Sequence, residues 1–221
     1  MKKFIYLAIL LLITQFSFAQ KKAVTEDGDT IFVYADGTWS FELLESGTAG
    51  TEFDFLSAEL KLDTIKQEQQ FSKKATSVVK NSFGLFTLRY DPEKWKREPP
   101  AQYNEDAEFA LIARDKDIYC IVISEEVEIG AENIVKIALN TMRENTNAEV
   151  ELVKTEVRTV NEKDLIRAVY NVDLSGMNLT FDSYYYSSEK GTIQFTTWTG
   201  QNIWEKYEDE IIDFLNGLII N

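Results

Sequence analysis

The sequence predicts an α+β fold in which an antiparallel sheet of about six to seven strands carries packed helices. Three observations favour this class. Short runs of apolar and β-forming residues are separated by turn residues. Most of these runs follow one another without a helix between them, which favours antiparallel pairing. Two further stretches repeat apolar residues every three or four positions, which is the period of an amphipathic helix.

The expected elements follow the order β-β-β-α-β-β-β-β-α within a domain over residues 81–221. Strands are expected at 85–90, 109–114, 119–125, 149–159, 163–174, 179–187 and 192–199. Helices are expected at 131–145 and 202–218. Asn161-Glu162 and Ser175-Gly176 supply tight-turn signals between strands of the second group.

A small β-hairpin is expected ahead of this domain, over residues 20–45. β-forming residues at 30–34 precede Asp36-Gly37, a dipeptide typical of hairpin turns, and a second strand follows it. Residues 46–80 are interpreted as a linker, because the stretch begins with small residues and contains a polar run.

Residues 1–19 have the three-part layout of a secretory signal peptide. Lys2-Lys3 gives a positive start, and residues 4–13 form an unbroken apolar run that is too short to span a bilayer. Ser17 and Ala19 are the small residues that precede a cleavage site. We therefore expect export to the periplasm or the exterior, with no stable membrane span after cleavage.

Cleavage is expected before Gln20. The alternative is an uncleaved membrane anchor, which the charged pair Lys21-Lys22 disfavours. Loss of Lys2 and Lys3 changes the net charge from −14 to −16. A chain this acidic repels nucleic acid and anionic lipid, so we expect no nucleic-acid partner.

The residue types restrict the chemistry. Histidine is absent, which removes Ser-His-Asp catalysis and His-ligated zinc. Cys120 is the single cysteine, and its apolar neighbours predict a buried strand in which the thiol acts as a small hydrophobe. We therefore name no catalytic residue, no cofactor and no metal ligand. The 37 carboxylates leave calcium binding and carboxylate-pair catalysis open.

Several core positions form a recognisable pattern along the domain. They include Tyr90-Asp91-Pro92 with Trp95 after it, the polar helix near 131–145, and a strand meander that carries Tyr184-Tyr185-Tyr186. A closing amphipathic helix with Trp204-Glu205-Lys206-Tyr207 completes it. From Phe83 to Ile220 this pattern resembles the PsbP-like α/β sandwich family.

The resemblance implies a fold and leaves the function open. The family includes an extrinsic subunit of photosystem II and a Ran-binding nucleotide-release factor, which act by binding proteins, and exported bacterial proteins without assigned roles. The resemblance therefore implies a bacterial exported member of unknown role. Near the N-terminus, Ala35-Asp36-Gly37-Thr38-Trp39 resembles a short DGTW element of bacterial exported proteins.

Aromatic residues supply the candidate interaction surface, which consists of Tyr184, Tyr185, Tyr186, Trp198 and Trp204. Successive residues of a strand point to opposite faces, so at least one of the three tyrosines is expected to point away from the core. Such a platform can stack on sugars or receive side chains of a partner. The alternative is that these rings pack the sheet beneath the helices.

The preferred hypothesis is a secreted, non-catalytic binding or accessory protein of the bacterial periplasm or cell surface. Its expected partner is an envelope protein or a glycan. The alternative is a glycosidase-like hydrolase that acts through a carboxylate pair. A deep pocket with two carboxyls of oppositely shifted pKa would favour the hydrolase, and a shallow aromatic patch would favour the binding protein.

Overall fold

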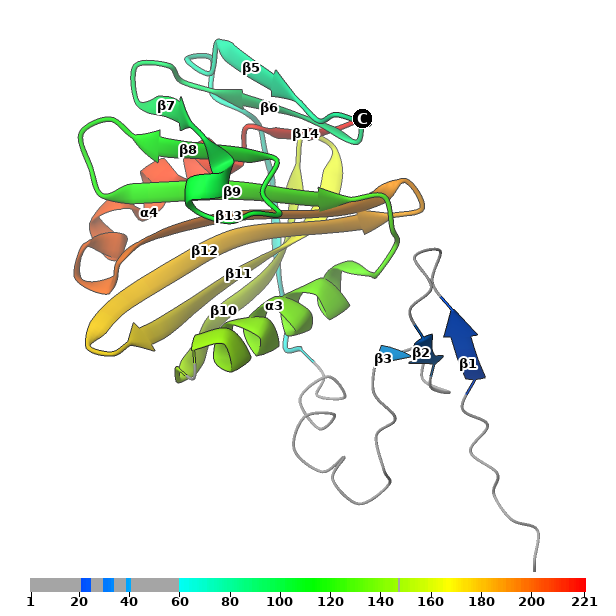
Figure 1. Ribbon diagram of the computed structural model, residues 1–221. Coiled ribbons are helices and arrows are strands. Elements are labelled where there is room, and N and C mark those ends of the chain that lie inside the picture. The colour runs from blue at the N-terminus through cyan, green and yellow to red at the C-terminus, as the bar shows by residue number, and fades with distance from the viewer. Residues whose placement is uncertain (1–20, 25–29, 34–38, 41–59, 147) are drawn as a thin grey trace, which may run out of the picture. The chain divides into compact units, whose positions relative to one another are not determined.

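The computed structural model describes residues 21–24, 30–33, 39–40, 60–146 and 148–221 (Figure 1). The chain divides into two compact units, Met1–Asp54 and Phe55–Asn221. In the first unit, the described strands are β1 (Lys21–Val24), β2 (Thr30–Val33) and β3 (Trp39–Ser40), and they pair in that order. The antiparallel pairing of β2 with β3 is the expected hairpin. The signal peptide 1–19, the Asp36-Gly37 turn and residues 46–59 lie outside the described residues.

An eight-stranded mixed sheet forms the centre of the second unit, in the order β4-β10-β11-β12-β13-β9-β8-β7. Neighbouring strands are antiparallel except β4 and β10, which are parallel. The strands are β4 (Asp63–Gln69), β7 (Trp95–Glu98), β8 (Phe109–Ala113), β9 (Ile118–Glu125), β10 (Val150–Val160), β11 (Lys163–Leu174), β12 (Met177–Ser188) and β13 (Gly191–Gly200).

A second sheet and two α-helices cover the two faces of the large sheet (Figure 1). The small sheet has the order β14-β6-β5, with β5 (Ser77–Lys80), β6 (Phe86–Tyr90) and β14 (Leu218–Ile220). Helix α3 (Ala131–Thr146) packs on β10, β11 and β12 from one side. Helix α4 (Gln201–Leu215) and the small sheet pack on the other. Neither of these helices is long and apolar enough to cross a bilayer.

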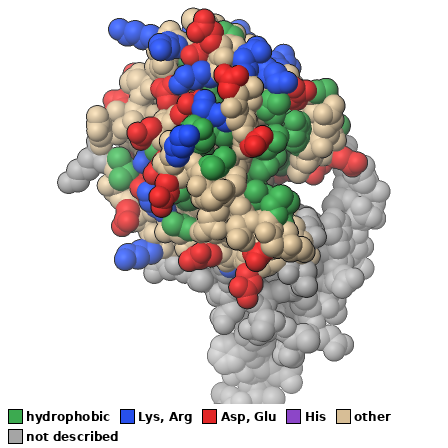
Figure 2. Space-filling model, turned by 90° about the vertical axis from the view of Figure 1, so that its left-hand side faces the viewer, with side chains coloured by type: hydrophobic (Ala, Val, Ile, Leu, Met, Phe, Trp, Pro, Cys, Tyr) green, Lys and Arg blue, Asp and Glu red, His purple; other side chains and the backbone are tan. Residues whose placement is uncertain are grey.

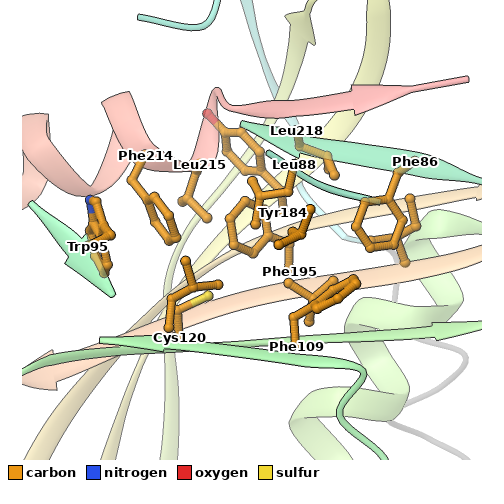
Figure 3. Packing of buried hydrophobic residues seen from close by; sticks show 14 of the residues in the cluster. Phe86, Leu88, Trp95, Phe109, Cys120, Tyr184, Phe195, Phe214, Leu215 and Leu218 are labelled. Atoms are coloured by element: carbon orange, nitrogen blue, oxygen red, sulfur yellow. The ribbon is translucent and has the colours of Figure 1, made fainter. Parts of the chain in front are cut away.

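The larger hydrophobic core lies on the α4 side of the large sheet, where side chains from both sheets meet (Figure 3). Phe214 of α4 stacks on Trp95 of β7 with 3.7 Å between ring centroids. Phe195 of β13 approaches Phe214 edge-on at 5.3 Å. Cys120 is 1% exposed within this core, which confirms the buried strand expected around it.

The expected turns are present. Asn161 and Glu162 have φ of 47° and 69°, and Ser175 and Gly176 have φ of 56° and 91°. Two consecutive residues with positive φ are the requirement of a type I′ hairpin turn, whose twist suits antiparallel strands. These two turns join β10 to β11 and β11 to β12.

The α+β class is confirmed, but the sheet has more strands than expected. The predicted linker 46–80 is wrong from residue 63 onward, because β4 and β5 pair with β10 and β6. β4 is a polar edge strand, so its sequence resembles a loop although its backbone is paired.

The second helix is shorter than expected. It ends at Leu215, and β14 follows almost at once. Gly217 lies in close contact with β6, because a Cβ atom there would overlap the carbonyl oxygen of Arg89. The Arg89 N–H donates to the Gly217 carbonyl at 2.9 Å. Glycine therefore permits the chain to leave the helix and return beside β6.

Candidate functional site: an aromatic face of the large sheet

Four aromatic residues lie opposite one another on neighbouring strands. Tyr170 of β11 is the cross-strand partner of Phe181 of β12. Trp198 of β13 lies between Phe181 on one side and Tyr119 of β9 on the other. Directly opposite residues in an antiparallel sheet place their side chains side by side on one face. These four residues are called the aromatic ladder.

The rings of the aromatic ladder are stacked. Tyr170 and Phe181 lie 5.1 Å apart between centroids, with 1° between their planes. Phe181 and Trp198 lie 6.1 Å apart at 24°, and Trp198 and Tyr119 lie 5.6 Å apart at 19°. Each such pair adds about 0.5–1.5 kcal/mol beyond the burial of area. The indole of Trp198 therefore has a ring against each of its faces.

The aromatic ladder runs from the core to the surface. At its inner end, Tyr170 and Phe181 are 2% and 8% exposed and belong to the core cluster that includes Ile134 of α3. At its outer end, Trp198 and Tyr119 are half-buried. Figure 1 shows α3 against the part of the sheet formed by β10, β11 and β12, with β9 and β8 beyond it.

Tyr103 joins the outer end of the ladder. It directly follows the 3-10 helix η1 (Pro100–Gln102), and its ring centroid lies 6.1 Å from Tyr119 and 6.0 Å from Trp198. Half-buried Ile112 is the cross-strand partner of Tyr119, and half-buried Ile121 lies two residues along the same strand. Tyr103, Ile112, Tyr119, Ile121 and Trp198 are called the open face. Hydrophobic side chains gather on the right-hand half of Figure 2, which corresponds to the front of Figure 1.

The structure separates the predicted interaction residues. Tyr184 and Tyr185 are both 0% exposed, so the prediction of a surface role is wrong for these two. Tyr184 enters the core on the α4 side and Tyr185 the core on the α3 side. Because both faces of β12 are covered here, alternation along the strand does not expose either ring. Tyr186 is half-buried and packs against the α4-side core.

Trp198 and Trp204 are both half-buried, but they lie on opposite faces of the sheet. Trp198 stacks on Phe181 on the α3 side. Trp204 lies on α4, and its Nε1 donates to Oδ2 of Asp182 at 3.3 Å. The two therefore do not form one surface. Of the five predicted residues, Trp198 belongs to the open face.

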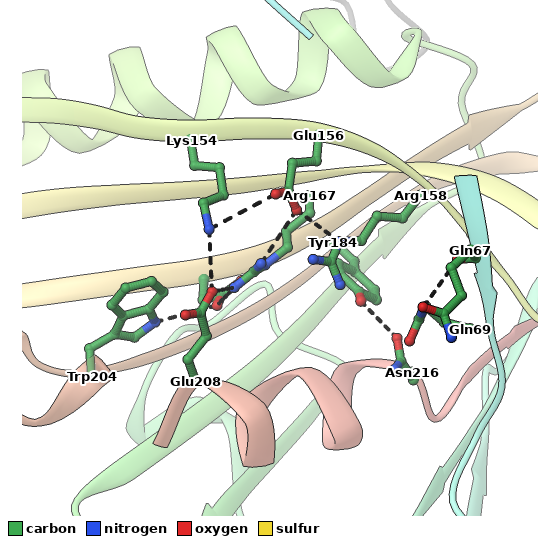
Figure 4. Close-up of polar contacts among 11 residues, drawn as sticks. Gln67, Gln69, Lys154, Glu156, Arg158, Arg167, Tyr184, Trp204, Glu208 and Asn216 are labelled. Atoms are coloured by element: carbon green, nitrogen blue, oxygen red, sulfur yellow. Dashed lines mark hydrogen bonds and ion pairs between the residues drawn. The ribbon is translucent and has the colours of Figure 1, made fainter. Parts of the chain in front are cut away.

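Beneath α4, the other face of the sheet carries a partly buried charge cluster (Figure 4). Its cations are Lys154, Arg158 and Arg167, and its anions are Glu156, Asp182 and Glu208. Arg167 is 0% exposed and donates to both carboxylate oxygens of Asp182, at 2.8 and 2.6 Å. It also donates to Glu208 at 2.9 Å. The cluster thereby joins α4 to β11 and β12.

These contacts hold Arg167 and Glu208 in their charged forms. Burial alone would lower the pKa of Arg167, but the hydrogen bonds and charges of Asp182 and Glu208 raise it above its ordinary value. Partial burial acts to raise the pKa of Glu208, yet the hydrogen bond and charge of Arg167, together with Lys154, lower it overall. A general acid needs the opposite shift, a raised carboxyl pKa.

The hollows among the described residues include the following two. One, of about 380 Å³, is lined by Asn178, Gln201 and Asn202. The other, of about 490 Å³, is lined by Leu60, Lys61, Leu62 and Glu132. The described lining of each brings at most one carboxylate into the space. Within the same part of the chain, no group of three His, Cys, Asp or Glu residues is placed to hold a metal ion.

Sequence reasoning missed Tyr103 and Tyr119. Tyr119 lies in an apolar run, where it resembles any other strand residue. Tyr119 and Trp198 are 79 positions apart in the sequence, and they meet only because β9 and β13 pair in one particular register. The alternation of side chains along β9 could have indicated which face Tyr119 occupies. Ile118, Cys120 and Val122 face the α4-side core, so Tyr119 lies on the other face.

Comparison with known proteins concerns the fold. No protein-family model matches the sequence, and no curated protein matches it. Among solved structures, the cyanobacterial PsbP (CyanoP) from Synechocystis sp. PCC 6803 is 11% identical with a TM-score of 0.52, and the match covers 68% of this chain and 95% of that chain.

Two other solved structures match with lower TM-scores. LpqN, which is involved in cell envelope biogenesis of Mycobacterium tuberculosis, is 11% identical with a TM-score of 0.45, over 66% of this chain and 90% of that one. The protein of unknown function PA94 from Pseudomonas aeruginosa is 10% identical with a TM-score of 0.41, over 66% of this chain and 96% of that one. The second unit has the PsbP-like fold, as the sequence pattern predicted. At these identities the likeness concerns the fold alone.

Proposed function

We propose that this protein is an exported, non-catalytic accessory protein that binds a partner through the open face. The observation that carries the proposal is the aromatic ladder, whose inner rings are buried while Trp198 and Tyr119 reach the surface. Aromatic residues in such partly buried settings dominate binding energy at protein interfaces. The buried inner rings fix the position of the outer ones, so little conformational entropy is lost on binding.

Four features support a non-catalytic role. Histidine is absent, and the one cysteine is buried. The three carboxylates of the charge cluster each contact a guanidinium or ammonium group. The pKa of Glu208 is lowered, whereas glycosidase chemistry needs one carboxyl whose pKa is raised.

Export rests on the N-terminal sequence. Ser17 and Ala19 place a cleavage site before Gln20. The intact mass of protein recovered from a bacterial periplasm should correspond to a chain that begins at Gln20. Recovery of the chain with residues 1–19 still attached would contradict the export part of the proposal.

Binding through the open face is tested by photo-crosslinking in bacterial cells. A photoreactive amino acid at Ile121 should give a discrete covalent adduct. The matched control is the same amino acid at Val78, an apolar strand residue that is 43% exposed on β5 of the small sheet. Adducts at Ile121 and none at Val78 support the proposal. Equal yields at both positions, or none at Ile121, would rule out the open face as the binding surface.

A further inference from the structure

We infer that the partner of the open face is a protein surface with an apolar centre and Lys or Arg residues around it. This inference rests on the proposed function, because it names the class of partner for the same face. Three observations carry it: the charges at the rim, the occupied faces of the aromatic rings, and the net charge of the chain.

Carboxylates dominate the rim of the open face. Exposed Glu105 and Asp106 follow Tyr103 by two and three positions, and exposed Asp117 precedes Tyr119 by two. Burial raises the pKa of the Tyr103 hydroxyl, and the nearby charge of Glu98 raises it further. Complementary charges around an apolar centre speed encounter and select the partner.

The cations near this rim have other contacts. Lys96 pairs with Glu98 at 2.8 Å between Nζ and Oε1. Arg114 donates to the Pro92 carbonyl at 2.8 Å, and Lys116 pairs with Glu210 of α4 at 3.0 Å. Residues 96–128 contain nine carboxylates and four Lys or Arg residues, so the charge of this part of the chain is negative.

A sugar fits this face less well than a protein does. Sugars bind aromatic residues by lying flat on a ring face, but both faces of Trp198 are taken by Phe181 and Tyr119. Stacked rings present their edges, which carry the positive part of the ring quadrupole, to whatever approaches. Side chains of a partner protein can pack between such edges.

A second copy of the chain is also a poor occupant. The full chain carries a net charge of −14, which becomes −16 on cleavage before Gln20, and contact between two open faces would bring two acidic rims together. Like charges placed against each other disfavour contact and suppress such pairing. Charge complementarity therefore selects a basic partner.

The inference is tested with the purified protein and three probes: a short peptide of alternating Lys and Leu, the same peptide with Glu in place of Lys, and a chitin tetrasaccharide. Binding is measured by calorimetry at low and at physiological salt. The Lys-containing peptide should bind most tightly, and added salt should weaken it. Tyr103→Ala and Ile121→Ala should weaken it by roughly tenfold, while Val78→Ala should leave it unchanged.

Charge reversal distinguishes an effect of the rim carboxylates on peptide binding from an effect of the net charge of the whole chain. Glu105→Lys together with Asp106→Lys should weaken binding of the Lys-containing peptide by roughly tenfold or more. Glu162→Lys together with Glu189→Lys changes the net charge equally at two exposed hairpin turns and should have a much smaller effect.

Equal effects of the two double variants, or tighter binding of the Glu-containing peptide or the sugar, would overturn the inference. Face-specific crosslinking at Ile121 would still stand in that case, so the proposed function and the inference fail separately. A crosslinked adduct at Ile121 whose mass is twice that of the chain would identify a second copy and overturn the inference as well.

Discussion

Arg167 and Asp182 meet in a two-point pair in which Nε and Nη2 of the guanidinium donate to the two oxygens of one carboxylate. Both side chains are at most 1% exposed. The Oδ2 atom of Asp182 also accepts from the indole N–H of Trp204, and Arg167 also donates to Glu208. The pair therefore connects two strands of the large sheet to the first two turns of α4.

Removing one member of this pair should be costly. Arg167→Ala leaves the buried carboxylate of Asp182 without its partner, and such a change lowers the free energy of unfolding by about 3–5 kcal/mol. Denaturant unfolding measures it. Lys154→Ala is the control, because the Lys154 side chain is 35% exposed and pairs of that kind contribute about 0–1 kcal/mol. Equal losses in the two variants would contradict a buried, coupled pair.

The lowered pKa of Glu208 predicts an acid-sensitive part of the stability. Its folded pKa lies below its unfolded one, so the stabilisation is present above the unfolded pKa and is lost as the pH falls through the folded pKa. Below about pH 5, the wild-type protein should lose stability more steeply than Glu208→Gln. Glu205→Gln, on the exposed side of the same helix, should follow the wild type. If the stability of wild type and of Glu208→Gln changed with pH in the same way, the lowered pKa of Glu208 would be refuted.

Loss of the hydroxyl group should affect the stability of the protein differently at two neighbouring tyrosines. The Tyr184 hydroxyl donates to Oδ1 of Asn216 at 2.8 Å, so Tyr184→Phe leaves a buried acceptor unpaired and costs about 1–3 kcal/mol. The Tyr185 hydroxyl lies near those of Ser183, Tyr170 and Thr196, but no hydrogen bond of good geometry forms with any of them. Tyr185→Phe should therefore be neutral or stabilising. Thermal unfolding measures the stability of the two variants. A larger loss of stability for Tyr185→Phe than for Tyr184→Phe would contradict this assignment of hydrogen bonds.

Burial raises the pKa of the Cys120 thiol well above its ordinary value. The thiolate is the reactive form, so Cys120 should not react with a thiol reagent in native buffer and should react at once in denaturant. Colorimetric thiol counting measures both rates. Fast labelling of the folded protein would place the thiol at the surface.

The sequence could predict those elements whose signal is local. The helix expected at 131–145 is α3 (Ala131–Thr146), and the strand expected at 163–174 is β11 (Lys163–Leu174). In the helix, apolar residues recur at helical spacing, and the strand begins directly after a turn that requires positive φ. β4 was missed because an edge strand needs only backbone pairing, and its polar side chains resemble those of a loop.

The candidate site could be predicted only in part, because it too depends on strand pairing that the local sequence does not show. Trp198 was found by residue type, because exposed aromatics favour binding. Its neighbours on the open face are Tyr103, which follows η1, and residues of β8 and β9. Which of these residues meet depends on the register between strands that are distant in the sequence. Tyr184 and Tyr185 were misassigned because alternation predicts opposite faces but not whether each face is covered.

The position of β6 between β5 and β14 has a consequence for the rate of folding. Leu88 of β6 lies opposite Leu218 of β14, 130 positions later in the chain. Closing a loop of that length costs about 4 kcal/mol of chain entropy before any pairing compensates for it. Sheets built from such distant contacts fold in about milliseconds to seconds, so refolding should be slow. Amide hydrogens of β6 that bond to β14 should become protected from exchange later than those of the local β11–β12 hairpin.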